Sequence, residues 1–257
     1  MRKFAAEVLA LGAPFLVLAV AWEAVARGGF FPPKLFPPLE TVFVTLVRLL
    51  VNGIIWANTE GTLLRLALGF LLAAVVGVGL GILMGRFRVA EDVLLPAVSF
   101  AYPIPGLAYA PLFVLWFGLG DLPTILLVGA ASCFTIILNT WKGVKAVKPI
   151  WLRAAEVMGA NERQMFRKVI LPAALPYILT GLRLGLAQAW RILIAVEMLM
   201  SVEKGLGWMI FGAQQFLETD VMLSGIAVIG LMGILLEKQV FERLERYTVV
   251  RWGMLTA

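Results

Sequence analysis

The chain has no histidine and only one cysteine, Cys133, among its 257 residues. Without histidine, neither a His-containing zinc site nor a Ser-His-Asp triad can form, and one cysteine cannot form an intramolecular disulfide. The sequence also lacks a G-x-x-x-x-G-K-[ST] loop, which cradles phosphates in many ATPases. We therefore expect no catalytic residue, no metal site and no bound cofactor in this chain.

Charged residues are scarce as well. They make up 15% of the chain, against 61% hydrophobic residues, and the mean hydropathy is +0.93. This composition excludes a soluble domain with a polar surface and predicts an all-α membrane protein with several spans. The net charge of +6 would suggest nucleic acid in a soluble chain, but here the cations flank apolar runs, where they set orientation and meet lipid head groups. We expect membrane lipid and no nucleic acid as a partner.

The length suits about six spans of roughly 20 residues each, with no room for a second domain. Residues 1–257 are therefore expected to form one transmembrane domain. The N-terminal apolar run has no convincing small-residue cleavage site, so it is predicted to be an uncleaved first helix. The expected spans are residues 9–26, 62–85, 93–117, 122–141, 177–200 and 221–236.

The distribution of Lys and Arg predicts that both termini lie in the cytoplasm, because cytoplasmic segments of membrane proteins carry an excess of these residues. The outer segments include loops 28–58 and 201–219. They and their borders hold only Arg27, Lys34, Arg48 and Lys204. The C-terminal residues 237–252 form a charged tail on the inner side. Residues 39–50 show the pattern of a short amphipathic helix, either a brace between spans or part of the surface that receives a substrate.

Glycine and proline mark two of the expected spans. Gly77, Gly81 and Gly85 recur every four residues, so they share one helix face and predict close helix packing. The third span contains Pro103 and Pro105 near its centre, which predicts a kinked or interrupted helix. Backbone carbonyls that lose their hydrogen bonds at such a break occur within a membrane only where they face other protein or a water-filled cavity. The third span is thus a pathway candidate, with a bent packing helix as the alternative.

A long inner loop, residues 142–176, is charged and interrupted by glycine and proline, and we interpret it as a cytoplasmic docking surface. Within it, residues 153–172 read RAAEVMGANERQMFRKVILP. This segment resembles the conserved cytoplasmic loop of ABC importer permeases, whose pattern is EAA, three residues, G, nine residues, I, one residue, LP. The positions that match are Ala154, Ala155, Gly159, Leu171 and Pro172.

The pattern has two departures in this chain. Arg153 stands where the pattern has Glu, and Val169 stands where it has Ile. Arg153 reverses a charge, and Glu156, three residues further on, is the acid that could substitute for it. The resemblance implies that the helix before Gly159 fits a cleft on an ATP-binding subunit. The alternative is an ordinary amphipathic helix at the membrane surface. Pro172 and Pro176, at the end of the loop, are expected to form a joint into the fifth span.

Residues 30–250 are similar to the nitrate, sulfonate and taurine group of these permeases. The resemblance implies a type I ABC importer permease fold in a bacterial inner membrane. It also implies a homodimer of permeases, two ABC ATPase subunits that carry the ATP and Mg, and a periplasmic or lipid-anchored binding protein. The cargo would be a small anion: a sulfonate such as taurine, nitrate, bicarbonate or an organic acid. The alternative is a secondary transporter or channel that does not use ATP.

Charged residues inside spans are candidates for function, because an ionised side chain at mid-bilayer is costly unless it is paired or hydrated. The fifth span holds Arg183, Arg191 and Glu197. At 100° per residue the two arginines lie about 80° apart and can line one cavity. We hypothesise that Arg191, with Gln188 one turn before it, draws an anion into the pathway. The alternative is an ion pair of Arg191 with an acid such as Glu23 or Glu197.

Overall fold

The structure, a computed structural model, describes residues 2–200 and 202–238, with side chains from residue 13 onward. Most of the expected C-terminal tail therefore lies outside the described residues. Within them every regular element is helical, which confirms the all-α class. The elements are α1 (Arg2–Arg27), α2 (Leu39–Val51), α3 (Ile54–Arg86), α4 (Arg88–Ala101), the 3-10 helix η1 (Gly106–Tyr109), α5 (Ala110–Phe117), α6 (Asp121–Lys145), α7 (Pro149–Val157), α8 (Glu162–Met165), the π-helix η2 (Phe166–Ile170), α9 (Leu171–Leu199), α10 (Leu206–Gln215) and α11 (Thr219–Leu236).

Four helical stretches are long and apolar enough to cross a membrane: Ile54–Arg86, Asp121–Lys145, Glu162–Leu199 and Thr219–Leu236. A fifth is added if α4 and the η1–α5 segment together count as one broken span. These five correspond to the second to sixth expected spans. The first expected span falls within α1, where only part of the side chains is described, so a total of six remains a prediction.

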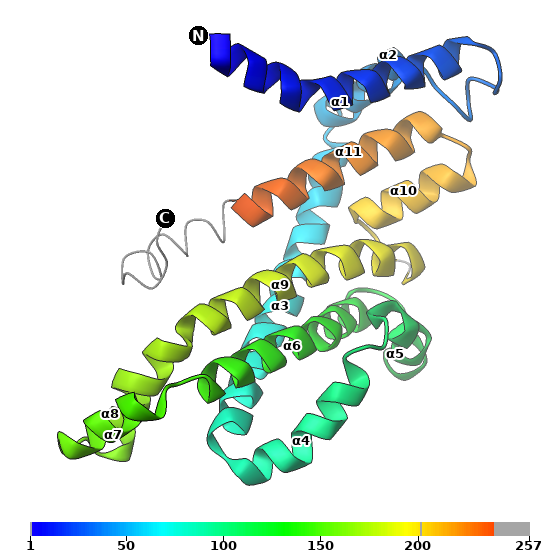
Figure 1. Ribbon diagram of the computed structural model, residues 1–257. Helices are drawn as coiled ribbons and strands as arrows, with labels where there is room; N and C mark the ends of the chain where they lie inside the picture. Colours follow the sequence, from blue (N-terminus) through cyan, green and yellow to red (C-terminus); the bar gives the residue numbers. More distant parts are fainter. Residues whose placement is uncertain (1, 201, 239–257) are drawn as a thin grey trace.

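The core is formed by α3, α6 and α9, which pack along much of their length (Figure 1). Small residues on α3 allow this contact. A Cβ added to Gly81 would lie 2.5 Å from Cβ of Thr140, and one added to Gly77 would lie 2.7 Å from Cβ of Ile136. Both distances are shorter than carbon atoms tolerate, so the predicted glycine stripe is confirmed as the packing face of α3.

The third expected span is interrupted, as the prolines predict. Helix α4 ends at Ala101, and the η1–α5 segment resumes at Gly106 after a bend of 94°. Pro105 precedes η1 directly. Gly106 packs so closely that an added Cβ would lie 2.7 Å from Cβ of Ala131 and 2.8 Å from Cδ1 of Ile192. The break is thus held against α6 and α9.

The fifth span begins differently from the expectation that Pro172 and Pro176 form a joint between the long inner loop and this span. That prediction is wrong, because the helix continues from Glu162 to Leu199. The N–H of Leu171 bonds to the carbonyl of Phe166, five residues earlier, in a wide π turn. This wide turn accommodates Pro172, which has no N–H to donate. Pro176 lies within the continuous helix.

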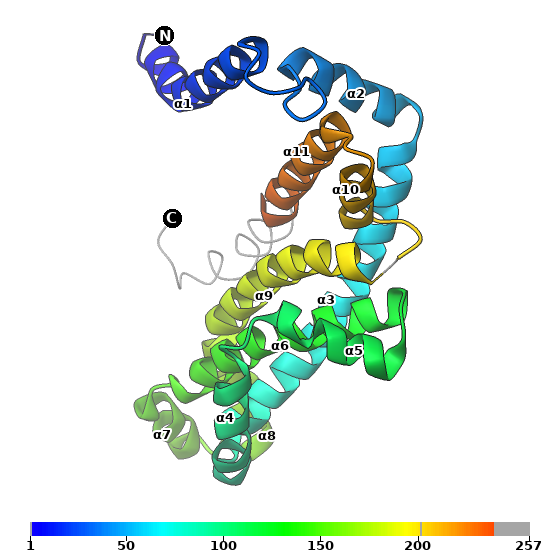
Figure 2. The same cartoon turned by 90° about the vertical axis from the view of Figure 1, so that its right-hand side faces the viewer.

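Two short helices, α2 and α10, pack against α11, and α11 lies between α2 and α9 (Figure 2). Helix α2 lies against α11, where the Thr45 hydroxyl donates to Asp220 Oδ2 at 2.6 Å and the Ser224 hydroxyl donates to the Val42 carbonyl at 3.1 Å. Helix α10 packs against both α9 and α11. These contacts favour the brace interpretation of the predicted amphipathic helix.

Candidate functional site

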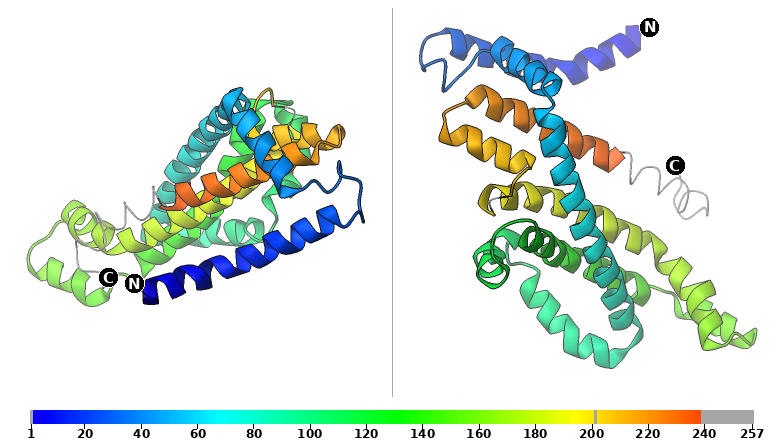
Figure 3. Two further views of the ribbon diagram at one scale, coloured as in Figure 1. Left: turned by 90° about the horizontal axis from the view of Figure 1, so that it is seen from above. Right: turned by 180° about the vertical axis from the view of Figure 1, so that it is seen from behind.

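The long inner loop projects from one end of the molecule. Helices α7 and α8 lie at the beginning of α9, and α10 lies near the other end of α9 (Figures 1 and 3). At the base of the loop, Val144 of α6 packs with Ala174 and Ile178 of α9 in a buried cluster. A force on the loop would therefore reach both core helices directly.

Helix α7 presents one buried and one exposed side. Ala155 is buried, whereas Arg153, Ala154 and Glu156 are exposed. Large apolar side chains are also exposed on and beside α7, namely Ile150, Trp151, Val157 and Met158. An exposed apolar patch at the end of a protein is typical of a contact surface.

Gly159 ends α7 with a backbone conformation that favours glycine. Its φ is +78°. Its N–H donates to the Glu156 carbonyl at 2.9 Å, and the N–H of Ala160 donates to the Ala155 carbonyl at 3.0 Å, which is a Schellman motif. No atom within 4 Å would meet an added Cβ, so glycine is required here for its conformation and not for space.

The next helix, α8, starts with a capping box. The Asn161 side chain accepts from the N–H of Gln164, and the Gln164 side chain accepts from the N–H of Asn161. Leu171 and Pro172, the last two positions of the matching pattern, form the first turn of α9. The turn between α7 and α8 is thus defined on both sides by local hydrogen bonds.

Arg86 connects the inner end of α3 to the long inner loop. Its Nη2 lies 2.9 Å from Glu162 Oε2, and its guanidinium lies 5.6 Å from the ring centroid of Phe166. The partner, 76 residues away, has no local signal in the sequence.

Arg153 and Glu156 do not compensate each other. Within the described part of the chain, neither residue forms an ion pair. Both charges are on the exposed side of α7 and are available to a partner.

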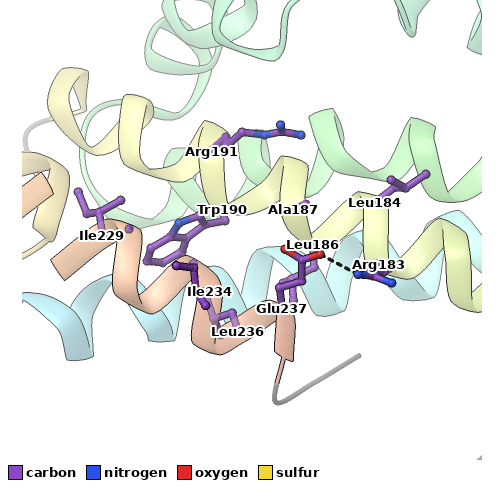
Figure 4. Close-up of a pocket in the computed structure, with 12 residues that line it drawn as sticks. Arg183, Leu184, Leu186, Ala187, Trp190, Arg191, Ile229, Ile234, Leu236 and Glu237 are labelled. Atoms are coloured by element: carbon purple, nitrogen blue, oxygen red, sulfur yellow. Dashed lines mark hydrogen bonds and ion pairs between the residues drawn. The ribbon is translucent and has the colours of Figure 1, made fainter. Parts of the chain in front are cut away.

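The fifth span borders a cavity of about 360 Å³ between α9 and α11. Arg183, Trp190 and Arg191 line it from α9. Arg183 Nη2 lies 2.8 Å from Glu237 Oε1, and Figure 4 shows Arg191 pointing away from this pair. Among residues 13–200 and 202–238, no acidic side chain forms an ion pair with Arg191.

The two acids named as alternative partners of Arg191 are engaged elsewhere. Glu197 pairs with Arg65 at 2.7 Å, and Glu23 pairs with Arg27. The alternative that Arg191 pairs with either of these acids is therefore wrong. Arg191 is thus a cation in the fifth span without an ion-pair partner among the described residues.

Gln188 bonds to α6 and does not line the cavity beside the two arginines. It accepts a hydrogen bond from the Thr135 hydroxyl, and its Nε2 donates to the Ala131 carbonyl at 3.2 Å. Ala131 also contacts the break after Pro105. Gln188 and Gly106, the residue after Pro105, thus both contact Ala131 of α6, whereas Arg183 and Arg191 line the cavity beside α11.

Residues 77–238 match the family described as "Binding-protein-dependent transport system inner membrane component". The chain belongs to this family. It is 38% identical to the taurine transport system permease protein TauC of Escherichia coli, over 86% of this chain and 82% of that one. It is 35% identical to the putative aliphatic sulfonates transport permease protein SsuC of Bacillus subtilis (93% and 85%) and 35% identical to the bicarbonate transport system permease protein CmpB of Synechococcus elongatus (73% and 67%).

Solved structures show the same fold at lower identity. The methionine ABC transporter MetNI in an inward-facing conformation matches this permease with a TM-score of 0.58 and 21% identity, over 79% of this chain and 98% of that one. An amino acid ABC transporter with histidines matches with a TM-score of 0.57 and 20% identity, over 80% and 96%. As a member of its family, the chain is an inner-membrane permease component, and ATP hydrolysis takes place on a separate ATPase subunit.

One group of residues in this permease was not predicted as a group. Glu197 was recognised as a charged residue within a span, but its partner Arg65 was not identified. They meet with Thr62 in the protein interior, where Glu197 is fully buried. Opposite charges in two spans were the available signal, but pairing across 132 residues cannot be read from local periodicity.

Proposed function

We propose that this permease, as one of two copies, forms the path through which an ATP-driven importer takes up a small anion. A periplasmic or lipid-anchored binding protein delivers the anion. The observation that carries the proposal is the cavity beside α9, which Arg183 and Arg191 both line. A guanidinium binds sulfonate, carboxylate or nitrate oxygens through two parallel hydrogen bonds. A cation without an acidic partner inside a span is costly, which favours a functional role for Arg191.

The relatives support an anion as cargo. Their names refer to taurine, aliphatic sulfonates and bicarbonate. The cargo of this permease accordingly belongs to the class of sulfonates, nitrate, bicarbonate and small organic acids. Family membership favours this function over a secondary transporter or channel.

The long inner loop is the proposed contact with the ATPase subunit. Arg153, Ala154, Ala155 and Glu156 lie on the helix that would enter the partner's cleft, and Gly159 sets the turn that follows. Two observations support this proposal. Apolar side chains around α7 are exposed, and the base of the loop is joined to α6 and α9, which pack against each other there in a buried cluster. Through Arg86, α3 would follow the same displacement.

The pathway proposal is tested by two variants of one residue. Arg191→Gln removes the charge and is expected to reduce uptake of the anion about tenfold, whereas Arg191→Lys, which keeps the charge, is expected to retain a substantial part of it. Uptake is measured in cells at matched membrane expression, first with taurine and bicarbonate as probes. Arg88→Gln, at an exposed arginine outside the fifth span, is the control. Normal uptake by Arg191→Gln would remove Arg191 from the pathway.

A further inference from the structure

Three side chains from two spans form a buried cluster at the outer end of the core. We call Thr62, Arg65 and Glu197 the anchor cluster. The Thr62 hydroxyl lies 3.0 Å from both oxygens of the Glu197 carboxylate, and Arg65 Nη1 lies 2.7 Å from Glu197 Oε1. Glu197 is 0% exposed and Arg65 is 4% exposed. The cluster therefore has little access to solvent.

The anchor cluster holds the beginning of α10. The first N–H groups of a helix have no partner within the helix, and the residue before α10, Gly205, has no side chain to supply one. Here the N–H of Leu206 donates to the Thr62 hydroxyl at 2.9 Å, and the N–H of Gly207 donates to Glu197 Oε2 at 3.0 Å. The N–H of Gly205 donates to Asn58 Oδ1 at 2.9 Å. Three consecutive backbone donors are thus satisfied by α3 and α9.

The start of α10 meets α3 and α9 along a contact that we call the seam. Close packing leaves α10 no room to slide along this seam. A Cβ on Gly205 would lie 2.6 Å from the carboxylate carbon of Glu197, and a Cβ on Gly207 would lie 2.3 Å from the Ile194 carbonyl oxygen. On the α3 side, a Cβ on Gly61 would lie 2.8 Å from the Lys204 carbonyl oxygen. The backbone around the start of α10 therefore touches both spans directly.

The cluster also reaches a third span. Arg65 Nε lies 2.7 Å from Asp121 Oδ1 in the first turn of α6. One guanidinium therefore joins the outer ends of α3, α6 and α9. Opening this seam would leave a carboxylate, a hydroxyl and backbone N–H groups without partners in a poorly hydrated interior, which is strongly unfavourable.

From these contacts we infer that Thr62, Arg65 and Glu197 are positioning residues that keep α10 fixed to α3 and α9 throughout the transport cycle. The outer ends of these helices then move as one body, and the path opens between other surfaces. The inference rests on the proposed coupling to an ATPase. It goes beyond that function, because it names a part of the permease that does not rearrange when ATP is bound.

A cross-linking experiment on the complex with the ATPase subunits tests this inference without knowledge of the cargo. Cys133 is replaced by alanine, and Ala57→Cys and Lys204→Cys are introduced at two positions that line one cavity beside the anchor cluster. The rate of disulfide formation is compared between the nucleotide-free complex and the complex trapped with ATP and vanadate. If the seam does not move, the rates of disulfide formation in the two states should agree within about twofold. The oxidised complex should also keep its ATPase activity within about twofold.

A difference between the two states of about tenfold or more, or loss of ATPase activity that a reductant restores, would overturn the inference. Failure of the pair to cross-link in either state would overturn it as well. The proposed function fails in a distinguishable way: the ATPase subunits would not assemble with the permease, or no nucleotide would be trapped.

Two matched threonines provide a second test. Thr62→Val removes the hydroxyl that bonds to both Glu197 and Leu206, whereas Thr59→Val removes a buried hydroxyl that has no hydrogen-bond partner among the described residues. The probe is labelling of Leu206→Cys, a fully buried position, by a membrane-impermeant maleimide. Thr62→Val is expected to accelerate labelling about tenfold and to lower the ATPase activity stimulated by the binding protein more than the basal activity. Thr59→Val is expected to change neither, and equal behaviour of the two variants would contradict the inference.

Discussion

At the scale of single residues, Gly159 adopts a conformation that only a few residue types reach easily. Its φ of +78° is accessible to glycine and, with a small penalty, to asparagine. Proline fixes φ near −65° and has no N–H to donate to the Glu156 carbonyl. The turn between α7 and α8 therefore depends on this residue.

Gly159→Pro is expected to reduce copurification of the ATPase subunit at least about tenfold, because it changes the direction in which α7 is presented. Gly159→Asn is the matched control and is expected to retain binding within about twofold, since asparagine tolerates a positive φ. Membrane insertion of both variants is checked by the yield of detergent-purified permease. Unchanged copurification and ATPase coupling in Gly159→Pro would contradict the docking role of the long inner loop.

Arg65 and Glu197 form an ion pair, and the stability of the permease depends on the presence of both charges. Arg65 also pairs with Asp121, whereas Glu197, which is 0% exposed, has Arg65 as its ion-pair partner among the described residues. Removing Arg65 leaves the carboxylate buried without that partner, a change that destabilises proteins by about 3–5 kcal/mol. Arg65→Met should therefore lower the temperature of thermal unfolding in detergent. The double variant Arg65→Met/Glu197→Gln has no buried charge left and should recover much of this loss. A double variant that is no more stable than the single one would show that the pairing contributes little.

At the scale of helices, the contact of α3 with α6 depends on small residues at fixed positions. Gly81→Val would place carbon atoms within the space of Thr140, because even a Cβ lies 2.5 Å from that side chain. Overpacking of this kind costs about 1–3 kcal/mol or more. Gly79 is two residues away, with nothing within 4 Å of an added Cβ. Gly79→Ala should leave the unfolding temperature unchanged or raise it, because alanine favours the helix. Equal effects of the two variants would contradict the packing described for α3.

Much of this helical architecture could be predicted, because spans and breaks depend on local sequence. The apolar runs gave the second to sixth spans, the glycine repeat gave the packing face of α3, and Pro103 and Pro105 marked the interruption. The continuous start of α9 was missed, because the effect of Pro172 depends on whether the preceding turn widens. The partners of Arg86 and Glu197 were missed because they are contacts between distant segments.

The candidate site was predicted only in part, because some of its features depend on local sequence and others on contacts between distant segments. The spacing of Arg183 and Arg191 places both on one cavity, since helical geometry alone determines this. Gln188 is close to them in sequence but bonds to α6, because the side of the helix that meets each neighbour depends on the tertiary fold.

At the scale of the whole molecule, the chain has a compact core and loosely attached parts. Helices α3, α6 and α9 form the core, with the long inner loop at one end and α10 near the other (Figure 3). Helix α1 contacts the rest of the chain mainly near α2, where Trp22 stacks on Phe36 with ring centroids 4.0 Å apart. In this arrangement, a movement imposed on the loop can pass through the core to the outer side.

The central claim is that this permease imports an anion only when an ATPase subunit acts on it. The most direct measurement is uptake of labelled anions, with taurine and bicarbonate as the first probes, into proteoliposomes that contain the permease alone or with its ATPase subunits, ATP and the binding protein. We predict uptake only when all of these components are present, and its loss in Gly159→Pro. Uptake by the permease alone, driven by an ion gradient and without ATP, would contradict the account.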